Sequence, residues 1–326
     1  MAGPAAIRSV RYAMILSDIL GAIGRTPLIR LSRVLPTGCA EVVAKVECLG
    51  PGGSVKDRAA LSMIADAERR GLLSPGATIV EGSAGNTGVG LALVCAVRGY
   101  RCVIVVPDTM SAEKRSVLGA LGAEVITARS DVEAADPEGY IGKAERLARE
   151  RKAFAPDQFE NPANALAHYT TTGLEILEAC EGKLDAFVAC VGSGGTLAGV
   201  ARLLRERVPA IRIVGAVPVR AEGGGGGEHT LVEGVVEDIV ACEGQGAEAD
   251  EVIAVPDASA VAMTLRLARE EAMLVGGSAG VAVVAALDVA RRLGPGKRVV
   301  TLLADTGRNY LSTYFNASWR ERHGMA

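Results

Sequence analysis

Three short segments of the sequence carry residue types that enzymes use to hold and convert small molecules. The first, residues 52–58, reads Gly-Gly-Ser-Val-Lys-Asp-Arg and places Lys56 where a helix is predicted to begin. The helix dipole disfavours positive charge at that end, which favours the neutral amine that acts as a nucleophile. A solvated surface lysine is the alternative interpretation, and this segment alone does not decide between the two.

The second segment is rich in glycine and lies between a predicted strand and a predicted helix. It reads Gly192-Ser193-Gly194-Gly195-Thr196. Backbone N–H groups at the start of a helix, together with the helix dipole, suit a phosphate. The segment lacks the lysine of a P-loop and the GxGxxG spacing of a dinucleotide site, so it indicates neither an ATPase nor a nicotinamide oxidoreductase. A tight turn that only packs a helix against a strand is the alternative.

The third segment, residues 81–88, reads Glu-Gly-Ser-Ala-Gly-Asn-Thr-Gly. Its hydroxyls, amide and backbone donors at a strand-to-helix turn could bind a carboxylate and the polar edge of a cofactor, although an ordinary capped helix would have a similar sequence. Taken together, the three segments offer an amine for an imine, a cradle for a phosphate and a polar loop for a carboxylate. Pyridoxal phosphate needs a protein to supply such groups, because its phosphate, aldehyde and ring nitrogen must all be held.

The elements that must position these segments alternate between strand and helix from about residue 40 onward. We expect strands at 41–46, 77–81, 102–107, 124–127, 186–191, 211–217 and 298–304. We expect helices at 57–70, 86–98, 113–121, 140–151, 166–179, 196–207, 259–271 and 280–292. Ser54 is available to cap the first of these helices. This alternation predicts a doubly wound α/β fold, in which ligands bind at the carboxyl ends of the strands, where the glycine-rich segments fall.

Composition excludes several classes of protein. The 326 residues carry a formal net charge of −3, which gives no general attraction to nucleic acid or to an anionic membrane. No apolar run approaches the roughly 20 residues that span a bilayer, and the short apolar stretch after Arg8 and Arg11 does not resemble a cleaved signal peptide. Seven scattered cysteines indicate buried thiols in a reducing cytoplasm, and only three histidines argue against a zinc site.

With these motifs in this order, the chain resembles the fold-type II pyridoxal-phosphate enzymes of the cysteine synthase and cystathionine β-synthase family. The resemblance extends from residues 24–28 to residues 308–311, and four blocks are most similar to bacterial cystathionine β-synthases: residues 167–169, 232–234, 276–280 and 308–310. It implies two doubly wound three-layer domains of the tryptophan synthase β type. The smaller, mobile domain would span residues 51–158, and the larger, cofactor-binding domain would combine residues 1–50 and 159–326.

The resemblance also implies roles for individual residues. Lys56 corresponds to the lysine that bonds pyridoxal phosphate and later moves the α-proton of the substrate. The implied cofactor contacts are Asn86 beside the 3′-oxygen, Ser278 at the pyridine nitrogen, and Gly192, Ser193, Gly194, Gly195 and Thr196 around the phosphate. The implied contacts to the substrate carboxylate are Ser83, Ala84, Gly85 and Thr87, with Gln158 beside them.

The implied reaction is β-replacement on serine, O-acetylserine or O-phosphoserine through an aminoacrylate, completed by a thiol such as homocysteine or sulfide. A specialised enzyme with a non-standard donor or nucleophile, and a serine or threonine dehydratase of the same fold, are the alternatives. A cofactor-binding homologue retained for partner binding is a further alternative, which the intact motifs oppose. By resemblance the protein is a cytoplasmic homodimer without nucleic-acid or membrane partners.

The sequence departs from the family pattern near the expected substrate. The family loop usually reads Glu-Pro-Thr-Ser-Gly-Asn-Thr-Gly, whereas here Gly82 replaces the proline and Ala84 replaces a hydroxyl. Val236 stands where the family usually has glycine, and Arg220 could meet an anionic group, although a solvated loop arginine is the simpler interpretation. The glycine run 223–227 is either a flexible linker or a mobile cover. These departures suggest an altered donor or acceptor, and a tolerant housekeeping enzyme is the alternative.

Overall fold

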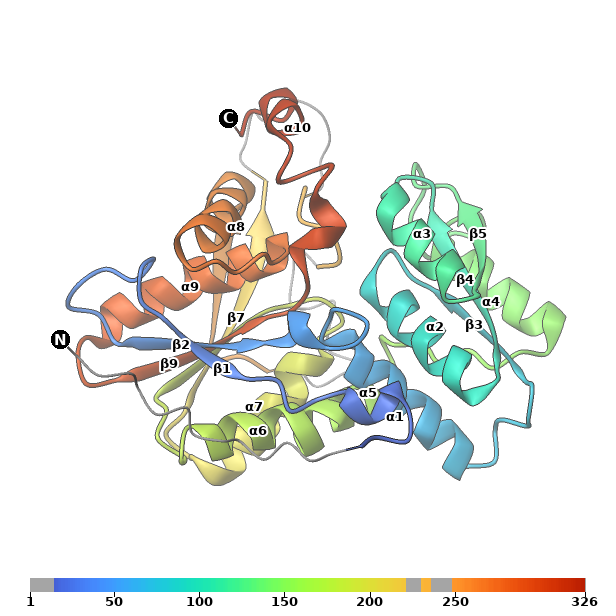
Figure 1. Ribbon diagram of the computed structural model, residues 1–326, viewed down its shortest axis with the longest axis horizontal. Coiled ribbons are helices and arrows are strands. Elements are labelled where there is room, and N and C mark those ends of the chain that lie inside the picture. The colour runs from blue at the N-terminus through green and yellow to red at the C-terminus, as the bar shows by residue number, and fades with distance from the viewer. Residues whose placement is uncertain (1–14, 221–229, 236–247, 326) are drawn as a thin grey trace.

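The computed structural model describes residues 15–220, 230–235 and 248–325, and contains two sheets (Figure 1). The larger sheet has six strands in the order β1-β2-β9-β6-β7-β8, and the smaller has three in the order β3-β4-β5. The strands are β1 (Leu28–Leu31), β2 (Glu41–Val46), β3 (Thr78–Gly82), β4 (Arg101–Pro107), β5 (Glu124–Ala128), β6 (Ala186–Cys190), β7 (Arg212–Val219), β8 (Glu251–Pro256) and β9 (Arg298–Leu303). The predicted α/β fold with doubly wound sheets is therefore confirmed.

The larger sheet is covered by helices on both faces, and all of its strand pairs are parallel except β1 with β2. Helices α8 (Asp257–Glu270) and α9 (Gly277–Leu293) cover one face, and α6 (Gly173–Ala179) and α7 (Gly195–Arg207) cover the other (Figure 1). Strand β6 shows the reason, because Ala186 and Val188 join one apolar core while Phe187 joins the other.

The smaller sheet repeats this arrangement. Ile79 and Ile104 pack toward α1 (Lys56–Arg69) and α2 (Asn86–Arg98), whereas Val80 and Val103 pack toward α4 (Tyr140–Arg151) on the opposite face. Helix α3 (Ala112–Ala120) follows β4. Helix α1 contacts α2 and also α5 (Pro162–Ala167), so it links the smaller sheet to the helices under the larger one. The remaining helices are short: η1 (Ile19–Ala22), η2 (Glu47–Leu49), η3 (His168–Thr172), η5 (Gly307–Tyr310) and α10 (Ala317–Arg322).

The helix expected over 166–179 is helical throughout and ends where predicted, but it begins earlier and is not a single α-helix. Asn161 caps α5 by accepting a hydrogen bond from the Ala163 N–H at 3.0 Å, and proline follows at the first helical position, so this helix begins earlier than expected. The chain then forms the π-helix η3 before continuing as α6. Wider π turns have no simple residue signature, so apolar periodicity carried the expected helix straight through this segment.

Two strands of the larger sheet are also absent from the sequence prediction. β1 and β8 lie at its two edges, and their side chains are largely half-buried or exposed, so neither shows the apolar run of a central strand. At the start of α1 the N-cap position is occupied by Val55 instead of Ser54. Ser54 still contributes, because its Oγ accepts a hydrogen bond from the Lys56 N–H at 3.2 Å.

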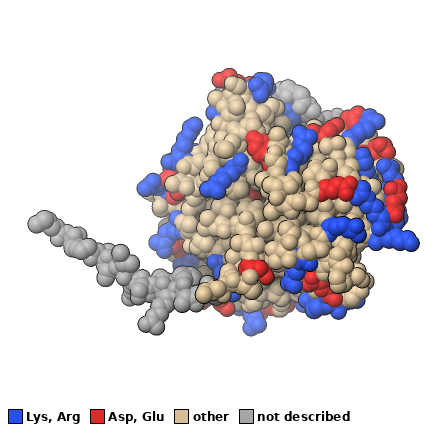
Figure 2. All heavy atoms as spheres, turned by 45° about the vertical axis from the view of Figure 1, so that its right-hand side comes forward, with Lys and Arg blue, Asp and Glu red and all other residues tan. Residues whose placement is uncertain are grey.

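The exposure of the cysteines and the distribution of surface charge bear on two further expectations. Of the described cysteines, Cys95, Cys102 and Cys180 are buried free thiols, whereas Cys39, Cys48 and Cys190 are half-buried, so the expectation of buried thiols is confirmed for only three of them. On the face shown in Figure 2, basic and acidic side chains intermingle without a continuous basic surface. Among the helices that the structure describes, none has the length and apolar character needed to cross a membrane.

Candidate active site

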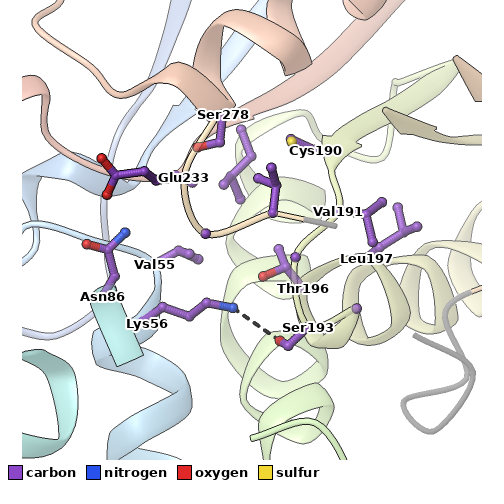
Figure 3. A pocket seen from close by; sticks show the side chains of 16 residues that line it. Val55, Lys56, Asn86, Cys190, Val191, Ser193, Thr196, Leu197, Glu233 and Ser278 are labelled. Carbon is purple, nitrogen blue, oxygen red and sulfur yellow. Dashed lines mark hydrogen bonds between the residues drawn. The ribbon is translucent and has the colours of Figure 1, made fainter. Parts of the chain in front are cut away.

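The expected cofactor residues lie together in one pocket between the two sheets. Its lining includes Lys56, Asn86, Ser278 and the glycine-rich turn after β6, of which only Gly195 does not line the pocket. Figure 3 shows the Lys56 side chain extending toward Ser193, with Asn86 on one side and Ser278 on the opposite wall. The segments that carry these residues are far apart in the sequence, and the carboxyl ends of the parallel strands bring them together.

Lys56 is the first residue of α1 and crosses toward the larger sheet. Its Nζ donates a hydrogen bond to Ser193 Oγ at 3.1 Å, so the lysine tip and the glycine-rich turn are in direct contact (Figure 3). Val55, the preceding residue, is tied to strand β9 because its N–H donates to the Ala304 carbonyl at 2.8 Å. The start of α1, which packs against the smaller sheet, is therefore fixed to segments that follow β6 and β9 of the larger sheet.

A buried ionic network holds the first turn of α1. Arg58 donates from Nε to Glu47 at 2.7 Å and from Nη1 to Glu175 at 2.7 Å, and Lys45 donates to Glu175 at 2.5 Å. Burial alone would raise the pKa of Glu175, but hydrogen bonds from Arg58 and Lys45 hold that pKa at about 2. These charges anchor the helix two residues beyond Lys56.

The glycine-rich turn has the geometry of an anion cradle. Gly194 has φ +82°, the left-handed conformation that favours glycine, and α7 begins at the next residue. No side chain caps this helix start, so its first N–H groups remain available to a ligand. A Cβ on Gly192 would lie 2.9 Å from the Gly234 carbonyl oxygen, so glycine lets the two loops approach each other.

The expected carboxylate loop lines an adjoining pocket that shares Lys56, Asn86 and Ser193 with the first. This pocket is lined by Ser83, Ala84, Gly85, Thr87 and Gln158, together with Tyr140 and Phe159. The two hydroxyl groups of the loop form hydrogen bonds with the backbone of the loop and with the side chain of Gln158. Ser83 Oγ accepts from the N–H groups of Gly85 at 3.2 Å and Gly88 at 3.1 Å, while Thr87 Oγ1 donates to Gln158 Oε1 at 2.5 Å.

Glu81 joins this loop to the segment that carries Gln158. Its carboxylate accepts hydrogen bonds from the N–H groups of Asp157 at 2.9 Å and Gln158 at 3.2 Å. Burial raises the pKa of Glu81 to about 7, against the lowering effect of these two hydrogen bonds. The loop and the Gln158 segment are thus fixed to each other by a buried carboxyl group.

The side chain of Asn86 is hydrogen-bonded to a second buried carboxylate. Its Nδ2 donates to Asp305 Oδ2 at 2.8 Å, and the hydroxyl of Tyr310 donates to the same oxygen at 2.6 Å. Burial raises the pKa of Asp305, which follows the last strand of the larger sheet. Asp305 therefore fixes the side-chain amide of Asn86, a contact that sequence reasoning missed.

Comparison with known proteins adds a decisive observation. A family model described as "Pyridoxal-phosphate dependent enzyme" matches residues 19–305, which is most of the chain. The chain belongs to the pyridoxal-phosphate dependent enzymes. Its cofactor is accordingly pyridoxal phosphate.

Similar proteins within this family narrow the resemblance. The cystathionine beta-synthase of Apis mellifera is 42% identical over 324 residues, covering 96% of this chain and 64% of that protein. The cysteine synthase of Staphylococcus aureus (strain Mu50 / ATCC 700699) is 46% identical over 301 residues, covering 91% of this chain and 96% of that protein. The chain thus spans less than two thirds of the Apis mellifera enzyme but nearly the whole length of the Staphylococcus aureus enzyme.

Two solved structures share the fold and much of the sequence. An O-ureido-L-serine synthase superposes with a TM-score of 0.84 at 38% identity, covering 93% of this chain and 96% of that one. The O-acetylserine dependent cystathionine beta-synthase from Helicobacter pylori also gives a TM-score of 0.84 at 38% identity, covering 92% of this chain and 98% of that one.

The residues of this pyridoxal-phosphate dependent enzyme fit the cofactor. The start of α7 offers uncapped N–H groups for a phosphate, and Lys56 offers the amine. Ser278, the second residue of α9, presents a neutral hydroxyl to the same pocket. The pocket thus supplies each type of group that the cofactor needs.

One contact that spans the two sheets was not predictable from the sequence motifs. Lys114 on α3, whose side chain is 1% exposed, donates at 2.5 Å to Glu233, which lines the cofactor pocket. Its Nζ also lies 4.5 Å from the ring centroid of Tyr310. Lys114 lies on the smaller sheet's side and both partners lie on the larger sheet's side, so this ion pair joins the two sheets beside the pocket.

The departures from the family pattern have different outcomes. A Cβ on Gly82 would lie 2.6 Å from the Tyr140 carbonyl oxygen, so the glycine is explained by the close approach of α4 and not only by loop freedom. Arg220 follows β7, is half-buried and does not line the two pockets. Val236 and the glycine run 223–227 lie outside the described residues.

Proposed function

We propose that this enzyme catalyses β-replacement on a serine-type amino acid, with a thiol as the incoming nucleophile. The observation that carries the proposal is the convergence of Lys56, the uncapped glycine-rich turn and the loop at residues 83–87 around adjoining pockets. Relatives and structural neighbours named for cysteine, cystathionine and O-ureido-L-serine synthesis support it.

The residues of the pocket would have different roles in the reaction. Pyridoxal phosphate, when bound, supplies an aldehyde for the amino group and an electron-withdrawing ring. Lys56 Nζ would move the α-proton, because it is the amine at the centre of the pocket. Ser278 would face the ring nitrogen with a neutral hydroxyl, which favours loss of a β-substituent over more extensive carbanion chemistry. Residues 192–196 would hold the phosphate.

Recognition of the substrate carboxylate falls to the loop that begins α2. Ser83, Ala84, Gly85 and Thr87 would surround the carboxylate, and Gln158 is hydrogen-bonded to Thr87 on the same side. We further propose that residues 51–158 form the smaller domain and close on the substrate, as in hinge motions of other enzymes. The ion pair between buried Lys114 and half-buried Glu233 would then stabilise the closed form.

The test compares donors and nucleophiles on the purified holoenzyme. Serine, O-acetylserine and O-phosphoserine are each incubated with homocysteine, sulfide or a small amine, and products are identified by mass spectrometry. The proposal predicts a sulfur-containing amino acid from at least one donor. Keto acid formed at the same rate without any nucleophile would instead identify a dehydratase and overturn β-replacement.

A second candidate is a specialised β-replacement enzyme with a non-standard partner. Ala84, which lines the substrate pocket where the family usually carries a hydroxyl, favours it. Loss of one donor to a bound carboxylate costs about 1.5–3 kcal/mol if nothing replaces it. Efficient cystathionine formation from serine and homocysteine would eliminate this candidate.

The proposal also covers the oligomeric state and the cellular location of the enzyme. By its resemblance to the family, the enzyme would form a homodimer, and light scattering of the purified protein tests this directly. The free thiols of the described residues support a reducing cytoplasm. Small amino acids would be its substrates.

A further inference from the structure

The glycine-rich turn rests on a second layer of polar side chains that the proposed function does not assign. Helix α7 packs closely against α5 and η3. The absence of a side chain at Gly195 permits this approach, since a Cβ there would overlap the Asn164 side chain. One turn later, a Cβ on Gly199 would lie 2.8 Å from His168 Cβ. Asn164 and His168 stand four residues apart, are 0% exposed, and therefore lie directly behind the turn.

Asn164 fixes the hydrogen-bonding role of Ser193. Its Nδ2 donates to the Gln158 carbonyl oxygen at 2.8 Å and to Ser193 Oγ at 3.0 Å. The carbonyl can only accept, so it fixes the orientation of the amide. Lys56 Nζ donates to the same Ser193 oxygen at 3.1 Å. Because the Asn164 amide donates to the Ser193 oxygen whether or not Lys56 does, the Ser193 hydroxyl keeps its own proton for a further partner.

His168 contacts the hydroxyl of Thr196, as Asn164 contacts the hydroxyl of Ser193. Its Nε2 lies 3.2 Å from Thr196 Oγ1, and its Nδ1 lies 2.9 Å from Thr172 Oγ1. Burial, followed by the charges of Lys56 and Arg58, lowers the pKa of His168 well below its ordinary value. The ring is therefore neutral near pH 7, with one nitrogen donating and the other accepting. When Nε2 donates, Thr196 keeps its own proton for a ligand.

We propose that Asn164 and His168 are positioning residues that direct the hydroxyl protons of Ser193 and Thr196 toward the cofactor phosphate. The inference rests on the proposed role of residues 192–196 as the phosphate cradle. An anion selects the tautomer of His168 that donates from Nε2, because only then do both hydroxyls offer protons to it. The π-helix η3 begins at His168 and contains its partner Thr172, so the irregular turn coincides with this second layer.

The test measures binding of pyridoxal phosphate and of unphosphorylated pyridoxal to the apoprotein. Asn164→Asp places an acceptor where the structure has a donor, His168→Met removes both ring nitrogens, and His168→Gln restores a distal donor. Thr170→Ala, on an exposed residue of the same π-helix, is the matched control. We expect Asn164→Asp and His168→Met to weaken pyridoxal phosphate binding by about 10- to 100-fold.

The comparison of the two ligands separates positioning from general damage. Pyridoxal binding should stay within about twofold of the parent in both variants, and His168→Gln should recover most of the lost affinity for pyridoxal phosphate. The ³¹P resonance of the bound cofactor should shift in Asn164→Asp and stay unchanged in Thr170→Ala. Equal weakening of both ligands, or unchanged binding of pyridoxal phosphate, overturns the inference. A parent apoprotein that does not bind pyridoxal phosphate would instead contradict the cofactor site itself.

Discussion

The packing of α7 against α5 and η3 predicts opposite effects for the same substitution at two glycines. In Gly199→Ala the new Cβ would lie 2.8 Å from the Tyr169 backbone nitrogen and 2.8 Å from His168 Cβ, and would overlap the Ala165 carbonyl oxygen. Backbone atoms cannot rotate away, so the helices must separate. Gly119 lies on an exposed part of α3, and its Cβ would meet nothing within 4 Å.

The expected free energies follow from two competing effects. Replacing a helical glycine by alanine favours the helix by about 1 kcal/mol, a gain available at both positions. Overpacking of a filled interior costs about 1–3 kcal/mol, and clashes with backbone place Gly199 at the upper end of that range. Gly199→Ala should therefore be destabilised by about 1–2 kcal/mol, and Gly119→Ala should be stabilised by up to about 1 kcal/mol.

Thermal melting of the two holoenzyme variants checks these signs. Gly199→Ala should melt below the parent and should also bind pyridoxal phosphate more weakly, because separation of the helices moves His168 away from Thr196. Gly119→Ala should melt at or above the parent and bind the cofactor normally. A Gly199→Ala variant as stable as the parent would refute the close packing on which this reasoning depends.

Two further predictions concern buried charges. Lys114→Met should lower the free energy of unfolding measured in urea by about 1–3 kcal/mol, because it leaves Glu233 unpaired. Lys183→Met is the control and should change it little, because Lys183 and its partner Glu181 are 76% and 77% exposed. Equal effects of the two substitutions would contradict the role of Lys114 in joining the two sheets. Glu81 has its pKa raised to about 7, so its stabilising contribution is present below its unfolded value of 4.5 and is lost as the pH rises through 7. Glu81→Gln should therefore gain in melting temperature relative to the parent between pH 5 and pH 8, and a constant difference would disprove the raised pKa.

The regular elements were predictable because their residues repeat with a clear period. Helices 86–98 and 140–151 were predicted with the bounds that the structure has. The failures lie where local sequence does not determine the conformation. The segment 166–179 divides into three helical pieces, and edge strand 251–256 is held by pairing with β7 instead of by an apolar run of its own.

The candidate site divides in the same way. The turn at 192–196 and the loop at 83–87 were recognisable because glycine and hydroxyl residues cluster where a strand meets a helix. Asn164, His168 and Asp305 were not, because their contacts depend on how closely separate segments approach each other. Gly82 shows the limit most clearly, since its neighbour is the backbone of Tyr140 and lies 58 residues along the chain.

The proposed function depends above all on Lys56 being the residue that bonds the cofactor. Reduction of the holoenzyme with borohydride, followed by proteolysis and peptide mass spectrometry, locates the attached phosphopyridoxyl group. We expect a single modified peptide with the group on Lys56, and loss of both the modification and the visible absorption in Lys56→Ala. Modification of a different lysine, or unchanged turnover in Lys56→Ala, would contradict it.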